Sequence, residues 1–207
     1  MVKTVKLFVE GGGNSNALRT ECRAAFNAFL RNSGLDGHMP RIVACGSRQE
    51  AYSDYCTAAA HGENAILLVD SESPVIVSQD ATDDLNTWKP WYHLKNRQGS
   101  DGQLADNWDK PQNVSENDCH LMVELMESWF LADIQALKEY YGQGFIENCF
   151  TMSADLESIP KTKVIKTLEH ATRNTAKGTY RKGQHSFELL KRLDAEKVIT
   201  QSSWARR

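Results

Sequence analysis

The fold is decided by Lys6-Leu7-Phe8-Val9-Glu10-Gly11-Gly12-Gly13 and by a second stretch of the same kind, Ala65-Ile66-Leu67-Leu68-Val69-Asp70-Ser71-Glu72. Each is a short run of aliphatic and β-branched residues that ends in acid. Such runs, bounded by glycine or serine, are typical of strands buried on both faces. Parallel sheets covered by helices contain strands of this kind, and their ligand sites lie at the carboxyl ends of the strands. We therefore expect an α/β protein with Glu10, Asp70 and Glu72 at one sheet edge.

Two interpretations of these acids stay open. Three carboxylates brought together repel one another, and their pKa values rise unless a cation holds them. Hard oxygen ligands of this type suit Mg²⁺ or Mn²⁺. Alternatively, Glu10 and Asp70 simply end their strands and help to cap the helices that follow.

The intervening chain predicts two further βα steps. Apolar residues recur at helical spacing over 14–32, and Arg41-Ile42-Val43-Ala44-Cys45 reads as a strand. Ser47 and Glu50 form a capping box that opens a helix through about residue 60. Three βα repeats with short connections indicate a parallel sheet with right-handed crossovers. Arg48, in the first turn of that helix, is a candidate phosphate ligand or a salt-bridge partner of one of the acids.

The βα pattern stops between residues 73 and 118. Residues 74–77 can form one more short strand, and a polar segment rich in tryptophan follows. Three tryptophans offer too much burial for a disordered linker, so we expect an ordered, loop-rich segment. Its aromatic side chains either stack on nucleic-acid bases or fill a small lobe, and the second interpretation is favoured.

The remaining chain predicts helices over 120–141, 161–174 and 186–193. Glu127 lies among apolar residues of the first of these, which makes it a candidate buried carboxylate of the acidic cluster. Residues 177–185 combine glycines with basic residues, as in an exposed turn that contacts anions. Lys182 and His185 in this turn are candidates for contacting phosphate, and His185 is also a candidate general base, although a lone histidine more often only forms hydrogen bonds.

Composition points to one domain. The 207 residues are 41% hydrophobic, enough for one well-formed core. We expect residues 1–118 to form the α/β core with the tryptophan-rich segment, and residues 119–207 to form a helical part packed on it. That second part is basic, with twelve lysine and arginine residues against four acids between 161 and 207, although the whole chain carries a net charge of −3. A basic part beside an acidic centre suits an enzyme acting on phosphodiesters, and equally a plain solvated surface.

Location is predicted from cysteines and hydropathy. Five widely spaced cysteines without a C-x-x-C pair suggest neither disulfides nor zinc, and they fit a reducing cytoplasm. There is no apolar run of 18 residues, so neither a membrane helix nor a signal peptide is expected.

Val9-Glu10-Gly11 and Leu68-Val69-Asp70-Ser71-Glu72 resemble the Toprim catalytic fold. That fold pairs a glutamate at one strand end with a later D-x-D motif and occurs in topoisomerases, primases and OLD-type nucleases. The resemblance implies a three-layer core with a parallel central sheet. The second acid of D-x-D is Glu72 here, and its longer side chain puts direct metal contact in question.

More of the chain is similar to a bacterial Toprim-like family of unknown function. This resemblance rests on four segments, namely 46–48, 90–94, 120–133 and 182–190. It implies a partner of SMC/ABC-type ATPases in phage defence, acting as a metal-dependent nuclease on DNA or RNA.

Together these observations predict Mg²⁺- or Mn²⁺-dependent phosphodiester hydrolysis. The metal would be held by Glu10 and Asp70, with Glu72 and Glu127 as direct or water-mediated ligands, and Arg48, Lys182 and His185 would neutralise charge. The alternative is a non-catalytic subunit that docks on an ATPase and regulates it. No Walker motif is present, so ATP dependence would come from a partner. A homo-oligomer is compatible with either function.

Overall fold

Four parallel strands form the single sheet of the described chain. In the computed structural model, which describes residues 4–150 and 155–207, the strand order is β2-β1-β3-β4. The strands are β1 (Lys6–Gly12), β2 (Arg41–Gly46), β3 (Ala65–Asp70) and β4 (Cys119–Met122). All three pairings are parallel, which confirms the predicted α/β class with a parallel central sheet.

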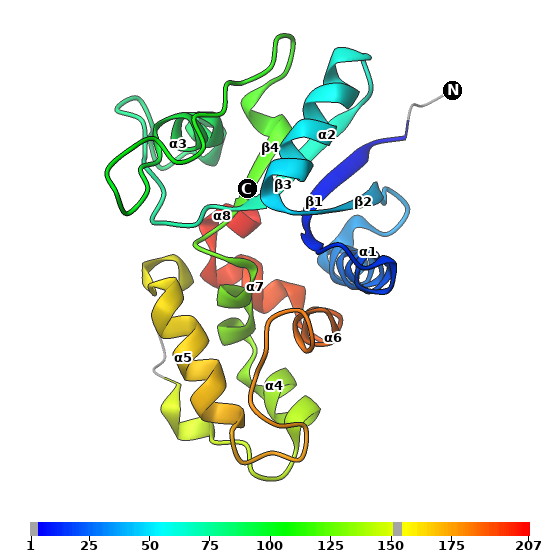
Figure 1. The fold of residues 1–207 in the computed structure, drawn as a ribbon, viewed down its shortest axis with the longest axis vertical. Coiled ribbons are helices and arrows are strands. Elements are labelled where there is room, and N and C mark those ends of the chain that lie inside the picture. Colours follow the sequence, from blue (N-terminus) through cyan, green and yellow to red (C-terminus); the bar gives the residue numbers. More distant parts are fainter. Residues whose placement is uncertain (1–3, 151–154) are drawn as a thin grey trace.

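Eight α-helices cover this sheet or follow it within the described residues. They are α1 (Asn16–Leu30), α2 (Arg48–Ala60), α3 (Pro90–Asn96), α4 (Ile134–Tyr141), α5 (Lys161–Thr172), α6 (Ser186–Leu190), α7 (Ala195–Gln201) and α8 (Ser203–Arg206). Figure 1 shows α2 and α3 in the part of the molecule that holds the sheet, and α4, α5 and α6 beyond the ends of its strands.

Alternation along the strands divides the core into two layers. Leu7 and Val9 of β1 pack on the face covered by α1 and the C-terminal helices. Phe8 points to the opposite face, which is covered by α2 and α3. Successive side chains of a strand point to opposite faces, so both faces of this apolar strand are buried. The result is a three-layer arrangement with the sheet in the middle.

Serine side chains cap the helices at both early βα connections, and the capping box predicted at Ser47 and Glu50 is present. Ser15 Oγ accepts a hydrogen bond from the Leu18 N–H at the start of α1. Ser47 and Glu50 form the full capping box of α2, with both reciprocal bonds made. Because these caps begin the helices directly after the strands, they place Gly11–Gly13 and Arg48 at the carboxyl edge of the sheet.

The prediction of one helix over 120–141 was wrong. This segment contains β4, then a 3₁₀ helix (η4, Met126–Ala132), then α4. Its first residues continue the sheet, with His120 paired to Leu68 and Met122 to Asp70. A continuous apolar run fits a buried strand as well as a helix, and here pairing with β3 prevails over helical spacing.

The fourth strand is β4 and not residues 74–77, which lie outside all strands of the described chain. Val77 is 61% exposed, and the Ile76 N–H donates to His93 Nδ1 instead of to a neighbouring strand. Since β4 begins at Cys119, the predicted boundary between residues 118 and 119 divides the sheet from its own edge strand.

The tryptophan-rich segment packs against α2. Trp91 and Trp108 are buried, and Trp108 stacks on Tyr52 with ring centroids 4.4 Å apart. These two rings fill the small lobe, in line with the favoured interpretation, whereas Tyr92 of the same segment is 42% exposed.

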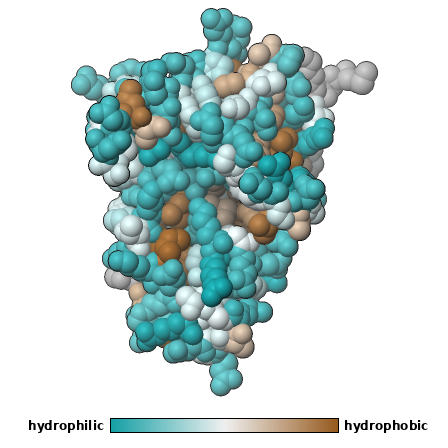
Figure 2. Space-filling view, in the orientation of Figure 1, coloured by the Kyte–Doolittle hydropathy of each residue, from teal (hydrophilic) through white to brown (hydrophobic). Residues whose placement is uncertain are grey.

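No helix in residues 4–150 or 155–207 is long and apolar enough to cross a membrane. On the face seen in Figure 2, hydrophilic residues predominate and hydrophobic ones form small, separate groups.

Candidate metal and phosphate site

Three carboxylates meet at the carboxyl edge of the sheet. Glu10 lies near the end of β1, Asp70 ends the neighbouring strand β3, and Glu72 follows two residues later. One oxygen of each lies within 4.8 Å of the others. The convergence expected from a parallel sheet is therefore present, although 60 residues separate Glu10 from Asp70.

Asp70 is the most buried of the three, with 2% of its surface exposed. Its Oδ1 accepts the Met126 N–H at 2.8 Å, and its own N–H donates to Glu10 Oε2 at 3.2 Å. Burial, and then the charge of Glu10, raise the pKa of Asp70 well above its usual range. Burial also raises the pKa of Glu10, against the opposing effect of the Asp70 N–H. The pair therefore favours a cation or a proton.

Glu72 is held by a lysine from the C-terminal part. Lys161 Nζ, at the start of α5, lies 2.5 Å from Glu72 Oε2. Burial acts to raise the pKa of Glu72, but the hydrogen bond and charge of Lys161 keep it below its usual value. The backbone of Glu72 is left-handed, with φ of 65°, a conformation that is uncommon for glutamate.

Lys182 joins two of the acids. Its Nζ lies 3.3 Å from Asp70 Oδ2 and 3.6 Å from Glu127 Oε2. Partial burial acts to lower the pKa of Lys182, and the charges of Asp70 and Glu127 outweigh it, so the pKa rises. Lys182 is therefore a permanent cation at the acidic cluster.

Glu127 lies in η4 and is fully buried. Its Oε1 accepts hydrogen bonds from Tyr180 Oη at 2.7 Å and from Ser186 Oγ at 3.3 Å. Its Oε2 has no hydrogen-bond partner among the described residues and faces only the Lys182 ammonium at 3.6 Å. A buried carboxylate oxygen without a hydrogen bond is costly, so Glu127 Oε2 is the unsatisfied acceptor beside the cluster.

Arg48 also contacts the acidic cluster. Its Nε donates to the Asp70 carbonyl at 2.8 Å and lies 4.0 Å from Glu10 Oε2. The guanidinium also pairs with Asp106 and lies over the Trp108 ring, 4.4 Å from its centroid. Its Nη2 is buried without a hydrogen-bond partner among the residues described. Arg48 thus forms a salt bridge with one of the predicted acids, Glu10, and its Nη2 stays without an acceptor among the described residues.

His185 does not contact the acids. Its Nδ1 accepts the Arg181 N–H at 3.1 Å, and its ring packs against Tyr141 and Tyr180. Burial lowers its pKa. In the described residues its contacts are those of a structural histidine that shapes the turn carrying Lys182.

Sequence reasoning missed Lys161, Tyr180 and Asp106 as parts of this site. Lys161 was one basic residue among twelve, and 89 residues separate it from Glu72. Tyr180 and Asp106 carried no motif. The one usable signal was the position of Tyr180 two residues before Lys182, in the basic turn.

A cavity of about 250 Å³ opens beside the acids. Its lining residues are Glu10, Gly11, Gly12, Gly13, Leu18, Gly46, Asp70, Met122, Met126, Lys182, Gly183, Ser186 and Phe187. The charged residues are Glu10, Asp70 and Lys182, and most of the other side chains are apolar.

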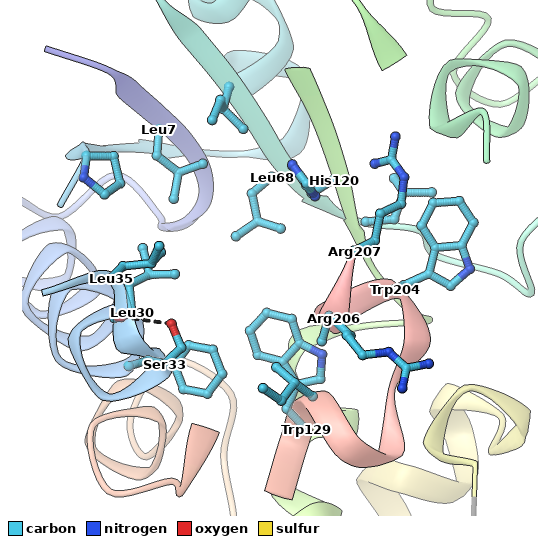
Figure 3. Close-up of a pocket in the computed structure, with 16 residues that line it drawn as sticks. Leu7, Leu30, Ser33, Leu35, Leu68, His120, Trp129, Trp204, Arg206 and Arg207 are labelled. Atoms are coloured by element: carbon cyan, nitrogen blue, oxygen red, sulfur yellow. Dashed lines mark hydrogen bonds between the residues drawn. The ribbon is translucent and has the colours of Figure 1, made fainter. Parts of the chain in front are cut away.

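A second cavity, of about 350 Å³, is chemically different (Figure 3). It is lined mainly by apolar residues such as Leu30, Leu68 and Trp129, and by no acid. Figure 3 shows the Arg206 and Arg207 head groups directed away from Leu30 and Leu35, and Arg207 donates to backbone carbonyls, including that of Cys119. This cavity therefore offers no carboxylate to hold a metal ion.

The acid geometry can be compared with the needs of a divalent ion. Opposite ligands of Mg²⁺, each at about 2.0–2.1 Å, lie roughly 4.2 Å apart, and Mg²⁺ usually keeps several waters. Oxygens within 4.8 Å of one another are thus close to this span, with waters completing the shell. Asp70 Oδ2 and Glu72 Oε2 already contact lysines, so an ion bound through these oxygens would compete with the lysines.

The fold and this site define an α/β protein with a buried acidic cluster and three basic residues at the carboxyl edge of a parallel sheet. Residues 9–207 match a family described as a domain of unknown function, DUF4276, and the chain belongs to that family. No curated protein and no solved structure matches the chain.

Proposed function

We propose that this protein is a Mg²⁺- or Mn²⁺-dependent hydrolase of phosphodiesters, with its site at Glu10, Asp70 and Glu72. The observation that carries the proposal is the meeting of these three carboxylates within 4.8 Å, at the edge where parallel sheets hold ligands. The raised pKa values of Glu10 and Asp70 support it, because a divalent ion would relieve the repulsion that raises them.

The residues divide into ligands and charge-neutralising groups. Glu10 and Asp70 would hold the metal, and Glu72 would be available to it only when not paired with Lys161. A bound ion of this kind polarises phosphate and lowers the pKa of a coordinated water. Glu127 would act on the metal only through a water, because Lys182 contacts both its free oxygen and Asp70.

Lys182 and Arg48 stabilise the negative charge that develops on the phosphate. Lys182 has three donors on a flexible stem and is more than half exposed, so it can turn from Asp70 to a phosphate oxygen. Arg48 is fixed by Asp106 and Trp108, 4.0 Å from Glu10 Oε2, so its charge is preorganised beside the cluster.

The test measures metal binding and cleavage together. In Glu10→Gln and Asp70→Asn, which keep side-chain shape, we expect the Mn²⁺-induced rise in melting temperature and the Mn²⁺-dependent cleavage of oligonucleotides to disappear. Glu188→Gln is the matched control, because Glu188 pairs with Lys191 and Arg192 away from the cluster. Cleavage that persists in both cluster variants would refute the proposal.

A second function is favoured by the lysines at the acids. Lys161 and Lys182 already occupy oxygens that a metal would use, as in a site where cations from the chain itself complete the structure. The protein would then be a non-catalytic subunit that docks on an SMC/ABC-type ATPase. Such a subunit shows no Mn²⁺-dependent rise in melting temperature, in the wild type or in any variant.

The resemblance to Toprim-like proteins supports nucleic acid, DNA or RNA, as the substrate and phage defence as the setting under either function. The five cysteines are all free thiols, which supports a reducing, cytoplasmic location. Co-purification with an ATPase encoded by a neighbouring gene would test the partnership directly.

A further inference from the structure

The lining of the cavity beside the acids has a charged part and an apolar part. Glu10, Asp70 and Lys182 are its charged residues. Met122, Met126, Phe187 and Leu18 supply apolar surface to the same cavity. A ligand with an anionic group joined to a ring would match these two parts of the lining. Thioether and aromatic side chains both pack well on rings.

The volume of this cavity limits the size of the ligand that it can hold. At about 250 Å³ it lies below the 300–1,000 Å³ of most ligand pockets and holds roughly eight waters at about 30 Å³ each. A base pair within a duplex is too large for it. One unpaired nucleoside unit is the part of a nucleic acid that matches its size and its apolar lining.

Glycine backbone forms the side of the cavity next to α1. Gly12 has φ of 87°, and a Cβ there would lie 2.7 Å from Arg19 Cα. The chain therefore lies directly against α1, and Leu18, in the first turn of that helix, is the side chain of α1 that reaches the cavity. Leu18 is only partly buried, so a larger residue at this position would narrow the cavity without entering the core.

Exposed cations continue from the cavity along the turn that carries Lys182. Lys177 and Arg181 are exposed and make no salt bridge with any carboxylate of residues 4–150 or 155–207. They lie within five residues of Lys182. The Lys177 ammonium lies over the Tyr140 ring, 4.7 Å from its centroid, so it contacts an aromatic ring and no acid. Exposed cations that no carboxylate neutralises, in the turn that also lines a nucleotide-sized cavity, are an arrangement that binds the phosphates of a single strand.

We propose that the site takes single-stranded nucleic acid, with one unpaired nucleoside in the cavity lined by Leu18, Met126 and Phe187 and the flanking phosphates on Arg181 and Lys177. This inference rests on the proposed function, since the phosphate at the acids is the one to be cleaved. It adds that a base-paired substrate must open, or end, at this point.

The test is a binding measurement on the full chain by fluorescence anisotropy. The probes are fluorescein-labelled oligonucleotides of one sequence, as single-stranded DNA, single-stranded RNA and blunt duplex DNA, each in EDTA and in Mn²⁺. We expect a single strand to bind at least about tenfold tighter than the duplex, equivalent to about 1.4 kcal/mol. Equal or tighter binding of the duplex would overturn the inference.

Substitutions at two adjacent positions in the first turn of α1 test where the nucleic acid binds. Leu18→Trp fills the cavity and should weaken single-strand binding by about tenfold or more. Ala17→Trp adds the same bulk at an exposed position outside the lining and should leave binding unchanged. Leu18→Phe replaces Leu18→Trp if the tryptophan variant fails to fold. Unchanged binding in the folded Leu18 variant would show that the strand lies elsewhere.

The Mn²⁺ response separates this inference from the proposed function. A Mn²⁺-induced rise in melting temperature that Asp70→Asn abolishes, without preference for single strands, keeps the metal site and rejects the cavity as a nucleoside site. Binding of single strands that Leu18→Trp weakens, without any response to Mn²⁺, keeps the nucleoside cavity and rejects the hydrolase.

Discussion

Lys182 Nζ lies 3.3 Å from Asp70 Oδ2, although 112 residues separate the two in the chain. The same ammonium lies 3.6 Å from Glu127 Oε2. One lysine from the basic C-terminal part is therefore the cation that two buried carboxylates share. This contact joins the C-terminal part to the sheet and engages an oxygen of Asp70, one of the candidate metal ligands.

Lys182→Met tests this competition. With the ammonium removed, Asp70 and Glu127 lose their shared cation, and we expect the metal-free protein to lose about 1–2 kcal/mol of stability, a value reduced because the lysine is more than half exposed. The same change should increase the rise in melting temperature at a given Mn²⁺ concentration and abolish cleavage. Lys191→Met, which breaks an ion pair with Glu188, is the control that should change neither. A weaker response to Mn²⁺ in Lys182→Met would show that the lysine assists metal binding.

The raised pKa of Asp70 predicts a pH-dependent contribution to stability. An acid whose pKa is higher in the folded than in the unfolded protein binds more protons when folded, so its contribution falls as pH rises. We expect the free energy of unfolding of the wild type minus that of Asp70→Asn to decrease as the pH rises from about 4, near the ordinary pKa of an aspartate, when divalent ions are absent. Urea denaturation across this range measures the difference.

The buried histidines change the free energy of unfolding with pH in the opposite direction. Their contributions cancel when the value for Asp70→Asn is subtracted from that for the wild type. Burial lowers the pKa of His93, His120 and His185, so each adds stability as pH rises through its unfolded value. All three are present in both proteins. A difference that stays flat with pH would show that Asp70 ionises normally in the fold. With Mn²⁺ present, binding should strengthen over the same range, because the metal needs the ionised carboxylates.

Two buried tyrosines form a matched pair for the hydrogen bonds of Glu127. Tyr180→Phe removes the donor at 2.7 Å from Glu127 Oε1 and should cost about 1.5–3 kcal/mol, as expected for a bond to a charged group. Tyr141→Phe removes a buried hydroxyl that has no partner among the described residues and should be neutral or slightly stabilising. Urea denaturation of both variants gives the comparison. Equal losses would mean that the Tyr180 bond contributes no more than packing.

The parts of this protein that were predictable are those set by local rules. The strand at Lys6–Gly12 and the capping box at Ser47 depend on short stretches of sequence, and parallel pairing then brings Glu10 to Asp70. The segment from His120 to Tyr141 was mistaken for one helix because an apolar run, such as the one that forms β4 at its start, suits either structure. Only its pairing with β3, more than 50 residues earlier, decides the outcome.

The lysine contacts were beyond sequence reasoning for a related physical reason. Lys161 and Lys182 reach the cluster because α5 and the turn after it pack beside the sheet edge, and charge alone does not indicate which of twelve basic residues does so. Long-range packing therefore determines which cations neutralise the acids. The acids themselves are placed by the sheet.

Glu72 provides the last test, because two effects oppose each other there. Its left-handed backbone, with φ of 65°, costs about 1 kcal/mol or more for a residue other than glycine, whereas its ion pair with the half-exposed Lys161 contributes up to about 1 kcal/mol. Glu72→Gly relieves the first and loses the second, so we expect unfolding free energy in EDTA to stay within about 1 kcal/mol of the wild type. Lys161→Met loses the ion pair and keeps the backbone cost, so it should be the less stable of the two variants.

If Glu72 is a metal ligand, Glu72→Gly should also reduce the Mn²⁺-induced rise in melting temperature, whereas Lys161→Met should increase it by freeing the carboxylate. An equal Mn²⁺ response in both variants would assign Glu72 to the structure of the loop and leave the metal to Glu10 and Asp70.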